Sequence, residues 1–478
     1  MRPLRITLVA SAIMALAATG AMAQAGDEPA CFADEAAPNE RMESCTTVSE
    51  DQDVPANIRA VALTLRASQL NDLGMTDKAL NDLARAIKLE PKLPFAYLAR
   101  AAIRADQEDF KGALADIDVA VKLEPNNAET LVSRGLHRMM TEDKDALADF
   151  DRAISLDPQN ADHLQMRAVA RRHAGDLDGA MADAELAVKL APGDPRSFSG
   201  RGDVYAARHD NARALADYDR ALEAQPDMDD VLIDRAALLL KAGDRAKAIA
   251  DLDRALQSSP DNVESLQLRA WAYSETITPE KARADHDRLV SIQPGKYEPL
   301  LDRAYFLIEQ KRFDLATADI DRAAALAPEN AEVVSARGDL YGHQRDWSRA
   351  IEEHDKALGM APKDPSILNG ACWIRARAEQ DLQRALDLCN QAVDLAPEQY
   401  AFIDSRAFVR FRLGEMDKAL ADVDAALALD LGAAEPRFMR GVIKLRQGQG
   451  EEGKADLAAA RRQRPGIDEE YASYGVTP

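Results

Sequence analysis

Eleven prolines recur along most of this 478-residue chain at a nearly constant interval, and no other feature restricts its fold as strongly. The interval is 34 residues, apart from one step of 33, one of 35 and a last step of 68, in which Leu431 takes the place of a proline. A period of this length with helical patterning is typical of a solenoid of stacked helical units. The prolines are Pro91, Pro125, Pro158, Pro192, Pro226, Pro260, Pro294, Pro328, Pro362, Pro397 and Pro465.

Each interval contains the signals for two helices. The proline lacks an N–H and clashes with the preceding turn, so it ends the second helix of each unit. Two residues later there is often a side chain that can cap the next helix, as at Asn160, Asp194, Asn262, Asn330 and Asp364. In the middle of several intervals a glycine suits the left-handed turn that ends the first helix, namely Gly74, Gly175, Gly243, Gly414 and Gly448.

Small residues recur where the two helices of a unit would face each other. When each closing proline is numbered position 32 of its repeat, position 8 is alanine or glycine in all repeats but the tenth, and position 20 is alanine in all but the last. Small side chains at facing positions let two antiparallel helices approach to the short end of the usual spacing of about 8–10 Å. A leucine at Gly202 or Gly338 is therefore expected to overpack the contact.

This pattern resembles the tetratricopeptide repeat family. The matching features are the small residue at position 8, an aromatic at position 11 (Tyr205, Tyr273, Tyr341), alanine at positions 20 and 27, an apolar or aromatic residue at 24 and proline at 32. Position 4 lacks the family's tryptophan, and position 7 is arginine instead of leucine. The resemblance implies an all-α fold, an α-solenoid of about twelve antiparallel helix hairpins in a right-handed superhelix, with a concave face made by the first helix of each pair.

The resemblance also suggests how the chain is divided. We expect a signal peptide over residues 1–23, an N-terminal segment over 24–57, twelve repeats over 58–465, and a closing helix and tail over 466–478. Within the N-terminal segment, residues 41–49 look like a lone second helix that covers the first full repeat. Solenoids need such caps because their end repeats otherwise expose a stacking face.

The first residues predict export. Arg2 and Arg5 precede an apolar run that ends near Ala18, and the small residues Ala21-Met22-Ala23 offer a cleavage site. This layout is that of a secretory signal peptide, and the run is short for a membrane span. We therefore expect an exported, periplasmic or secreted protein without stable membrane insertion after cleavage, the alternative being an uncleaved anchor.

Charge excludes one class of partner. The chain has 60 basic and 82 acidic residues, a net charge of −22, which becomes −24 when residues 1–23 and their two arginines are removed. A surplus of this sign repels phosphate backbones, and nothing resembles a basic patch. Nucleic acid is not expected as a partner.

The four cysteines form two local pairs, Cys31 with Cys45 and Cys372 with Cys389. In an exported protein such pairs are typical of disulfides. Cys372 and Cys389 fall at positions 8 and 24 of the tenth repeat, which face each other in the family's geometry, so a bond there would link the two helices of one hairpin.

An arginine at position 7 and an aspartate at position 23 recur in ten repeats each. One hypothesis makes the arginines a ladder for anions. The other pairs each arginine with aspartates of its own or the neighbouring repeat, and the equal numbers favour this second interpretation.

Position 9 changes along the chain in a way that suggests a binding surface. It holds small or modest residues such as Ser68 and Ala102 in the first half and larger ones in the second. On the first helix this position should point into the concave groove, where large aromatics would anchor a partner. The alternative is ordinary packing between neighbouring first helices. The predicted groove residues are Trp271, Tyr305, Asp339, Trp373 and Phe408, with Phe411 one turn further.

The sequence displays no catalytic motif and no cofactor motif. No phosphate loop, nucleophile elbow or metal-binding spacing occurs. His286 and His354 both occupy position 24 beside acidic residues, where a packed core histidine explains each better than a metal ligand does. We therefore expect no enzymatic activity, no cofactor and no metal.

The favoured hypothesis is a periplasmic scaffold or adaptor that binds a protein or an extended peptide in its concave groove. One alternative is an envelope-assembly accessory factor that holds a cell-wall or outer-membrane enzyme. Another is a structural or self-associating spacer without a specific ligand. The sequence identifies neither the partner nor the oligomeric state.

Overall fold

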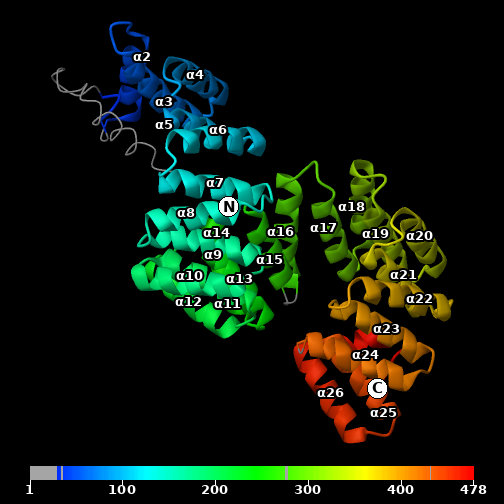
Figure 1. The fold of residues 1–478 in the computed structure, drawn as a ribbon. Helices are drawn as coiled ribbons and strands as arrows, with labels where there is room; N and C mark the ends of the chain where they lie inside the picture. The colour runs from blue at the N-terminus through cyan, green and yellow to red at the C-terminus, as the bar shows by residue number, and fades with distance from the viewer. Residues whose placement is uncertain (1–29, 34–35, 275–277, 431) are drawn as a thin grey trace. The chain divides into compact units, whose positions relative to one another are not determined.

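The computed structural model describes residues 30–33, 36–274, 278–430 and 432–478, and the predicted signal peptide lies outside them. In this part of the chain all regular structure is helical, with 26 helices that follow one another as antiparallel hairpins (Figure 1). The chain forms two compact units, residues 1–242 and 243–478, and each is described by itself.

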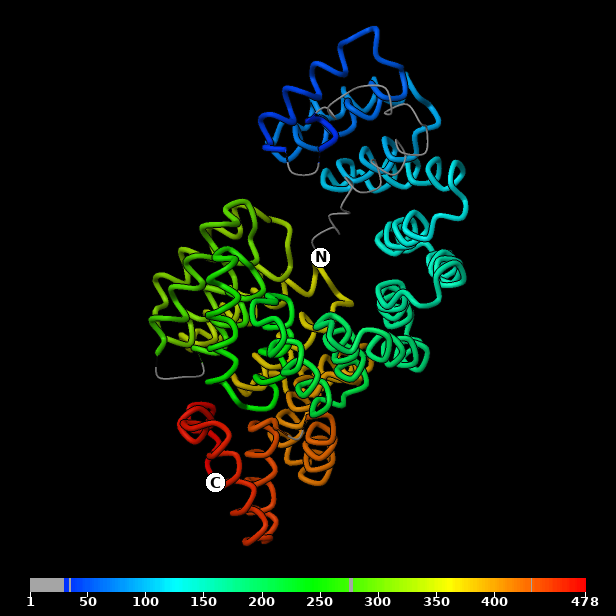
Figure 2. Tube along the Cα trace, turned by 90° about the vertical axis from the view of Figure 1, so that its left-hand side faces the viewer, coloured from blue at the N-terminus to red at the C-terminus, as the bar shows by residue number. Residues whose placement is uncertain are grey.

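The first unit contains a single helix, five hairpins and the helix that follows them. Figure 2 shows these hairpins in sequence from blue to green. The helices are α2 (Pro38–Glu50), α3 (Ala56–Asp72), α4 (Thr76–Leu89), α5 (Pro94–Asp106), α6 (Phe110–Leu123), α7 (Ala128–Met140), α8 (Ala146–Leu156), α9 (Ala161–His173), α10 (Leu177–Leu190), α11 (Pro195–Ala207), α12 (Asn211–Ala224) and α13 (Asp229–Lys241).

The second unit begins with one helix, continues with six hairpins and closes with a short helix. Its helices are α14 (Arg245–Ser258), α15 (Val263–Ser274), α16 (Pro279–Ile292), α17 (Glu298–Glu309), α18 (Phe313–Leu326), α19 (Ala331–His343), α20 (Trp347–Met360), α21 (Pro365–Ala378), α22 (Leu382–Leu395), α23 (Tyr400–Arg412), α24 (Met416–Leu429), α25 (Ala434–Arg446), α26 (Gly450–Gln463) and α27 (Ile467–Ser473).

The helices begin and end where the sequence predicts. Side chains of the predicted capping residues accept hydrogen bonds from the first turn of the following helix, as Asn160 does from the backbone of Asp162 and His163. The predicted turn glycines have positive φ, for example 80° at Gly175. Other hairpins place a non-glycine residue in the same left-handed turn, with φ of 61° at His209 and 56° at Lys311.

The two helices of a hairpin approach closely at the small positions. A Cβ built on Gly202 would lie 3.4 Å from the backbone oxygen of Ala214 and 2.7 Å from the ring of Tyr218. Gly338 has the same relation to the backbone of Ala350 and the ring of His354, at 3.2 and 2.7 Å. Glycine thus stands opposite the rings of Tyr218 and His354, which agrees with the predicted close approach.

First helices of successive hairpins also contact one another, as α17 does α19, α19 does α21 and α21 does α23. These helices form one continuous face of the second unit. Residues at the same repeat position on consecutive first helices therefore come near each other, and this face positions the candidate site.

Candidate partner-binding site

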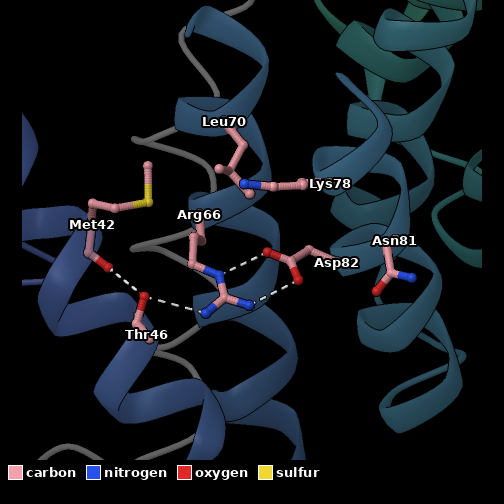
Figure 3. Close-up of a pocket in the computed structure, with 7 residues that line it drawn as sticks. All are labelled: Met42, Thr46, Arg66, Leu70, Lys78, Asn81 and Asp82. Atoms are coloured by element: carbon pink, nitrogen blue, oxygen red, sulfur yellow. Dashed lines mark hydrogen bonds and ion pairs between the residues drawn. The ribbon is translucent and has the colours of Figure 1, made fainter. Parts of the chain in front are cut away.

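An arginine and an aspartate join the two helices of most hairpins. Arg66 on α3 donates hydrogen bonds to Asp82 on α4, at 2.7 Å from Nε and 2.8 Å from Nη2. Figure 3 shows the two groups facing each other beside a hollow between α2, α3 and α4, with Thr46 accepting a third bond from Arg66. The same bidentate pair occurs at Arg100–Asp116, Arg134–Asp149, Arg167–Asp183, Arg201–Asp217, Arg269–Asp285, Arg303–Asp319, Arg406–Asp422 and Arg440–Asp456.

Several of these arginines also reach back to the preceding hairpin. Nη1 of Arg269 lies 2.6 Å from Oδ1 of Asp253, sixteen residues earlier. Each such arginine therefore links two consecutive hairpins, and those that also hold the bidentate pair neutralise aspartates of both. The predicted network is confirmed, and these guanidinium groups are occupied by carboxylates instead of forming a ladder for anions. The other links are Arg134–Asp118, Arg167–Asp151, Arg235–Asp219, Arg303–Asp287, Arg337–Asp321 and Arg440–Asp424.

The tenth hairpin, α21 and α22, replaces this pair with a covalent link. Ala371 and Leu388 occupy the positions of the arginine and the aspartate. One residue further along each helix, Cys372 and Cys389 form a disulfide, and both are fully buried.

The second disulfide joins Cys31 to Cys45 on α2. Helix α2 packs on α3 in the place of the second helix of a preceding repeat. Its Glu50 lies sixteen residues before Arg66 and within 3.9 Å of it. This is the same spacing as in the links between arginines and aspartates of preceding hairpins.

Three of the predicted groove residues meet in one hollow of the second unit. The hollow has a volume of about 280 Å³ and is open to solvent. We call it the α17–α23 hollow, because its walls come from the first helices α17, α19, α21 and α23. It is lined by Tyr305, Glu332, Ser335, Asp339, Ser366, Ile367, Asn369, Gly370, Trp373 and Phe402.

The charged groups that line the hollow are two carboxylates, Glu332 and Asp339. The Tyr305 hydroxyl donates a hydrogen bond of 3.3 Å to Oδ2 of Asp339 on the next first helix. Burial raises the pKa of Glu332, and the neighbouring carboxylates of Asp302 and Glu298 raise it further. Burial likewise raises the pKa of Asp302, whose carboxylate accepts a hydrogen bond from Gln267 on α15.

Beneath the hollow, the structure brings together three residues that sequence reasoning did not connect. His354 on α20 is fully buried, with Nδ1 3.3 Å from the Ser335 hydroxyl and Nε2 3.2 Å from Oδ1 of Asp339. Ser335 and Asp339 lie one turn apart on α19, and the histidine belongs to the partner helix of that hairpin. Only the hairpin geometry shows that they meet, so a search for sequence motifs could not find them.

The other predicted groove residues lie elsewhere. Trp271 on α15 is 47% exposed but does not line the hollow. The prediction that Phe408 and Phe411 are exposed in the groove is wrong, because they are 1% and 4% exposed and belong to the core of the last hairpins.

Two kinds of contact bury Phe408. Its ring lies 5.0 Å from that of Trp373 on the neighbouring first helix α21, and helix α27 with the residues after it covers the same rings. The ring of Tyr471 lies 6.4 Å from the ring of Phe408, and the ring of Tyr474 lies 6.3 Å from it. Tyr474 also meets Trp373 edge-on at 5.6 Å, and the buried Val476 belongs to the same core. The chain's own C-terminal segment thus covers the end of the face that the hollow occupies.

His286, the other histidine at position 24, packs against an aromatic ring. Burial lowers the pKa of His286 to about 4, and its ring packs 5.1 Å from that of Phe306, as expected for a core histidine. Among the residues that the structure describes, no group of three or more His, Cys, Asp or Glu side chains is arranged to hold a metal ion. No helix in the same residues is long and apolar enough to cross a membrane.

Comparison with known proteins gives a family and partial relatives. The sequence pattern of the family described as tetratricopeptide repeat matches residues 144–195, 200–296, 301–365 and 336–400, which is more than half of the chain. Bacteriophage adsorption protein A of Escherichia coli (strain K12) is 40% identical over 62 residues, 13% of this chain and 6% of that protein. Tetratricopeptide repeat protein 36 of Bos taurus is 38% identical over 86 residues, 17% of this chain and 46% of its own.

The chain therefore matches less than half the length of these two relatives. Among solved structures, yeast Tom70 is 17% identical, with 87% of this chain and 94% of that chain covered and a TM-score of 0.43.

Proposed function

This chain belongs to the tetratricopeptide repeat family, whose members generally bind peptides or other proteins, and from that premise we propose that it is a non-enzymatic scaffold or adaptor. It binds an extended segment of another protein in the α17–α23 hollow. The observation that carries the proposal is the position of Tyr305, Asp339 and Trp373 on three consecutive first helices around one open hollow. Such a row offers an extended chain repeated contacts, with aromatic side chains as anchors.

The contacts of Ser335, His354 and Asp339 support a structural role over a catalytic one. Ser335 and Asp339 lie inside α19, where backbone N–H groups bond to the preceding turn and none is free to stabilise an oxyanion. His354 lies between Ser335 and one carboxylate oxygen of Asp339, and the other oxygen accepts the hydrogen bond of Tyr305. Their role is to hold one polar wall of the hollow in place.

We further propose that the protein works outside the cytoplasm, in a bacterial periplasm. Support comes from the basic, apolar and small-residue order of residues 1–23 and from two disulfides, which persist in oxidising compartments. In that compartment the partner would be an envelope protein, and an accessory role in assembling a cell-wall or outer-membrane enzyme is a specific form of the same proposal.

The test is site-specific photo-crosslinking in the bacterium that makes the protein. A photoreactive amino acid at Tyr305 or Trp373 is expected to capture a defined partner. The matched control carries the same group at Leu395, which is 53% exposed on the second helix α22. Capture from Leu395 as strong as from Tyr305 would contradict a site in the hollow.

A second measurement separates a receptor from a self-associating spacer. Sedimentation of the purified protein over a range of concentrations is expected to give one species. A sedimentation coefficient that rises steadily with concentration, together with crosslinks only to other copies of the chain, would favour the spacer.

A further inference from the structure

The carboxylates that line the proposed site have no lysine or arginine among the other lining residues, and the basic side chain that contacts Asp339 is the buried His354 beneath them. Glu332 and Asp339 line the α17–α23 hollow, and none of the residues described as lining it is lysine, arginine or histidine. Glu298 and Asp302 extend the same charge along α17, since both interact electrostatically with Glu332. These four carboxylates differ from the aspartates of the arginine network, which already face a guanidinium group.

Burial and mutual repulsion act on these carboxylates together. Asp302 and Glu332 stay accessible to solvent, but partial desolvation and nearby like charges disfavour their charged form and raise their pKa values. A cation placed between them would relieve the repulsion. Among possible partner segments, the site therefore favours one that brings positive charge.

Aromatic faces stand beside this charge. Tyr305 on α17 is 37% exposed, and Trp373 lines the hollow from α21. A cation over an aromatic ring gains about 0.5–2 kcal/mol, depending on how far it is desolvated. The chain already uses this contact elsewhere, with the guanidinium of Arg349 4.4 Å from the centre of the Tyr341 ring and that of Arg377 4.8 Å from the Tyr474 ring.

We propose that the occupant of the α17–α23 hollow is an extended segment of a partner protein that is rich in lysine or arginine. Its cationic side chains lie between the carboxylates of Asp302, Glu332 and Asp339, and their alkyl stems cover Tyr305 and Trp373. This inference rests on the proposed function, because it specifies the chemistry of the segment that the hollow holds.

The experiment compares three fluorescein-labelled peptides of twelve residues by fluorescence anisotropy with the full mature chain. One alternates lysine with alanine around a central tyrosine, one has glutamate in place of lysine, and one has serine there. We expect the lysine peptide to bind at least about tenfold more tightly than the serine peptide, which corresponds to roughly 1.4 kcal/mol. Binding should weaken between 20 and 150 mM salt, because ions screen the attraction.

Two double variants, each of which removes two negative charges, test whether the lysine peptide binds at the hollow. Asp302→Asn with Glu332→Gln removes two charges from the site and should weaken binding of the lysine peptide by about tenfold or more. Asp314→Asn with Asp394→Asn removes two charges from exposed positions on the second helices α18 and α22 and should leave binding nearly unchanged. Equal losses in both variants would mean that only the net charge of the protein attracts the peptide, and would overturn the inference.

The same experiment distinguishes failure of the inference from failure of the proposed function. If the serine or glutamate peptide binds as tightly as the lysine peptide, and a photoreactive group at Tyr305 still captures it, the basic partner is wrong but the site stands. If none of the three peptides is captured at Tyr305 above the level of Leu395, both proposals fail.

Discussion

The guanidinium of Arg303 holds the carboxylate of Asp319 through two hydrogen bonds, 2.7 Å from Nε and 2.6 Å from Nη2, across the two helices of one hairpin. Asp319 is 3% exposed, so this is a buried ion pair with ideal bidentate geometry. Removing one member of such a pair strands the other in a poorly solvated place, whereas replacing both with apolar residues can be nearly neutral. The tenth hairpin has Ala371 and Leu388 at these positions and adds the disulfide of Cys372 and Cys389 beside them.

We therefore predict that Asp319→Ala lowers the free energy of unfolding of the second unit by about 2 kcal/mol, because two charged hydrogen bonds are lost while Arg303 keeps its bond to Asp287. The double variant Arg303→Ala with Asp319→Leu, which has the alanine and leucine of the tenth hairpin without its disulfide, should lose less than half as much. Thermal unfolding followed by circular dichroism measures both. A double variant less stable than the single one would show that the pair itself stabilises the hairpin.

The regular part of the fold could be predicted from the sequence because each repeat restates the same local rules. Proline and glycine mark the helix ends, and alanine or glycine marks the contact within a hairpin. The arginine–aspartate network followed from two residue types that recur in equal numbers at fixed positions. These features depend only on residues within one repeat or its neighbour, and the period fixes where those residues lie relative to one another.

Features that involve a segment outside the period could not be predicted in the same way. Position 9 correctly indicated that Tyr305 and Trp373 face the hollow, but the same rule failed for Phe408. Phe408 packs on Trp373 of the neighbouring first helix, and Tyr471 and Tyr474, which follow the last repeat and have no repeat position, cover both rings. The contact of His354 with Ser335 was missed because repeat position suggests packing but not which polar atoms meet.

A large side chain at Gly338 should overpack the contact between α19 and α20. Even a Cβ there would lie 2.7 Å from the ring of His354, so Gly338→Leu is expected to cost about 1–3 kcal/mol. Gly359 on α20 is the matched control, since a Cβ there meets nothing within 4 Å. Gly359→Leu should leave the midpoint of thermal unfolding unchanged or higher, and an equal loss in the two variants would contradict the close approach.

Several hairpin turns carry a side chain in a conformation that favours glycine. Lys311 has φ of 56°, while Gly243 and Gly414 occupy the same turn position in other hairpins with φ of 82° and 79°. Lys311→Gly should therefore stabilise the second unit by about 0.5–1 kcal/mol, as a left-handed conformation is costly for a residue with a Cβ. Lys311→Ala keeps the Cβ and is the control. Equal stability of the two variants in urea unfolding would be inconsistent with strain at this turn.

The stability of the last hairpins should depend on pH through Asp404. One of its carboxylate oxygens is inaccessible to solvent and has no hydrogen-bond partner among the described residues. Burial, followed by the charges of Glu435 and Glu470, raises the pKa of Asp404 to about 8. A carboxyl whose pKa is raised by folding stabilises the fold fully below its unfolded pKa of about 3.9, and this contribution is lost as pH rises through about 8.

Asp404→Asn resembles the neutral carboxyl and should remove this dependence. Its midpoint of thermal unfolding is expected to equal that of the wild type near pH 4 and to exceed it increasingly up to about pH 8, where the difference becomes constant. For a unit of this size each kcal/mol corresponds to roughly 2–4 °C. A difference between the two proteins that shrinks as the pH rises would refute a raised pKa at Asp404.

The C-terminal segment should detach from the helices that it covers without unfolding the repeats. Tyr474 meets Trp373 edge-on at 5.6 Å, and the backbone oxygen of Tyr474 accepts a hydrogen bond from Arg412. Val476 is fully buried in the same core. Because these contacts lie at the end of the segment, Tyr474→Ala with Val476→Ala should release the tail while the repeats stay folded.

Trp373 reports the release directly when it is the only tryptophan, in a background of Trp271→Phe and Trp347→Phe. We expect the double variant to shift its emission to the red and to increase quenching by acrylamide about twofold, because burial excludes water from the ring. Tyr97→Ala, on α5 in the first unit, is the control and should change neither. Unchanged emission in the double variant, with helical content preserved, would mean that the segment does not cover Trp373 in solution, and the burial of Phe408 would then need another cause.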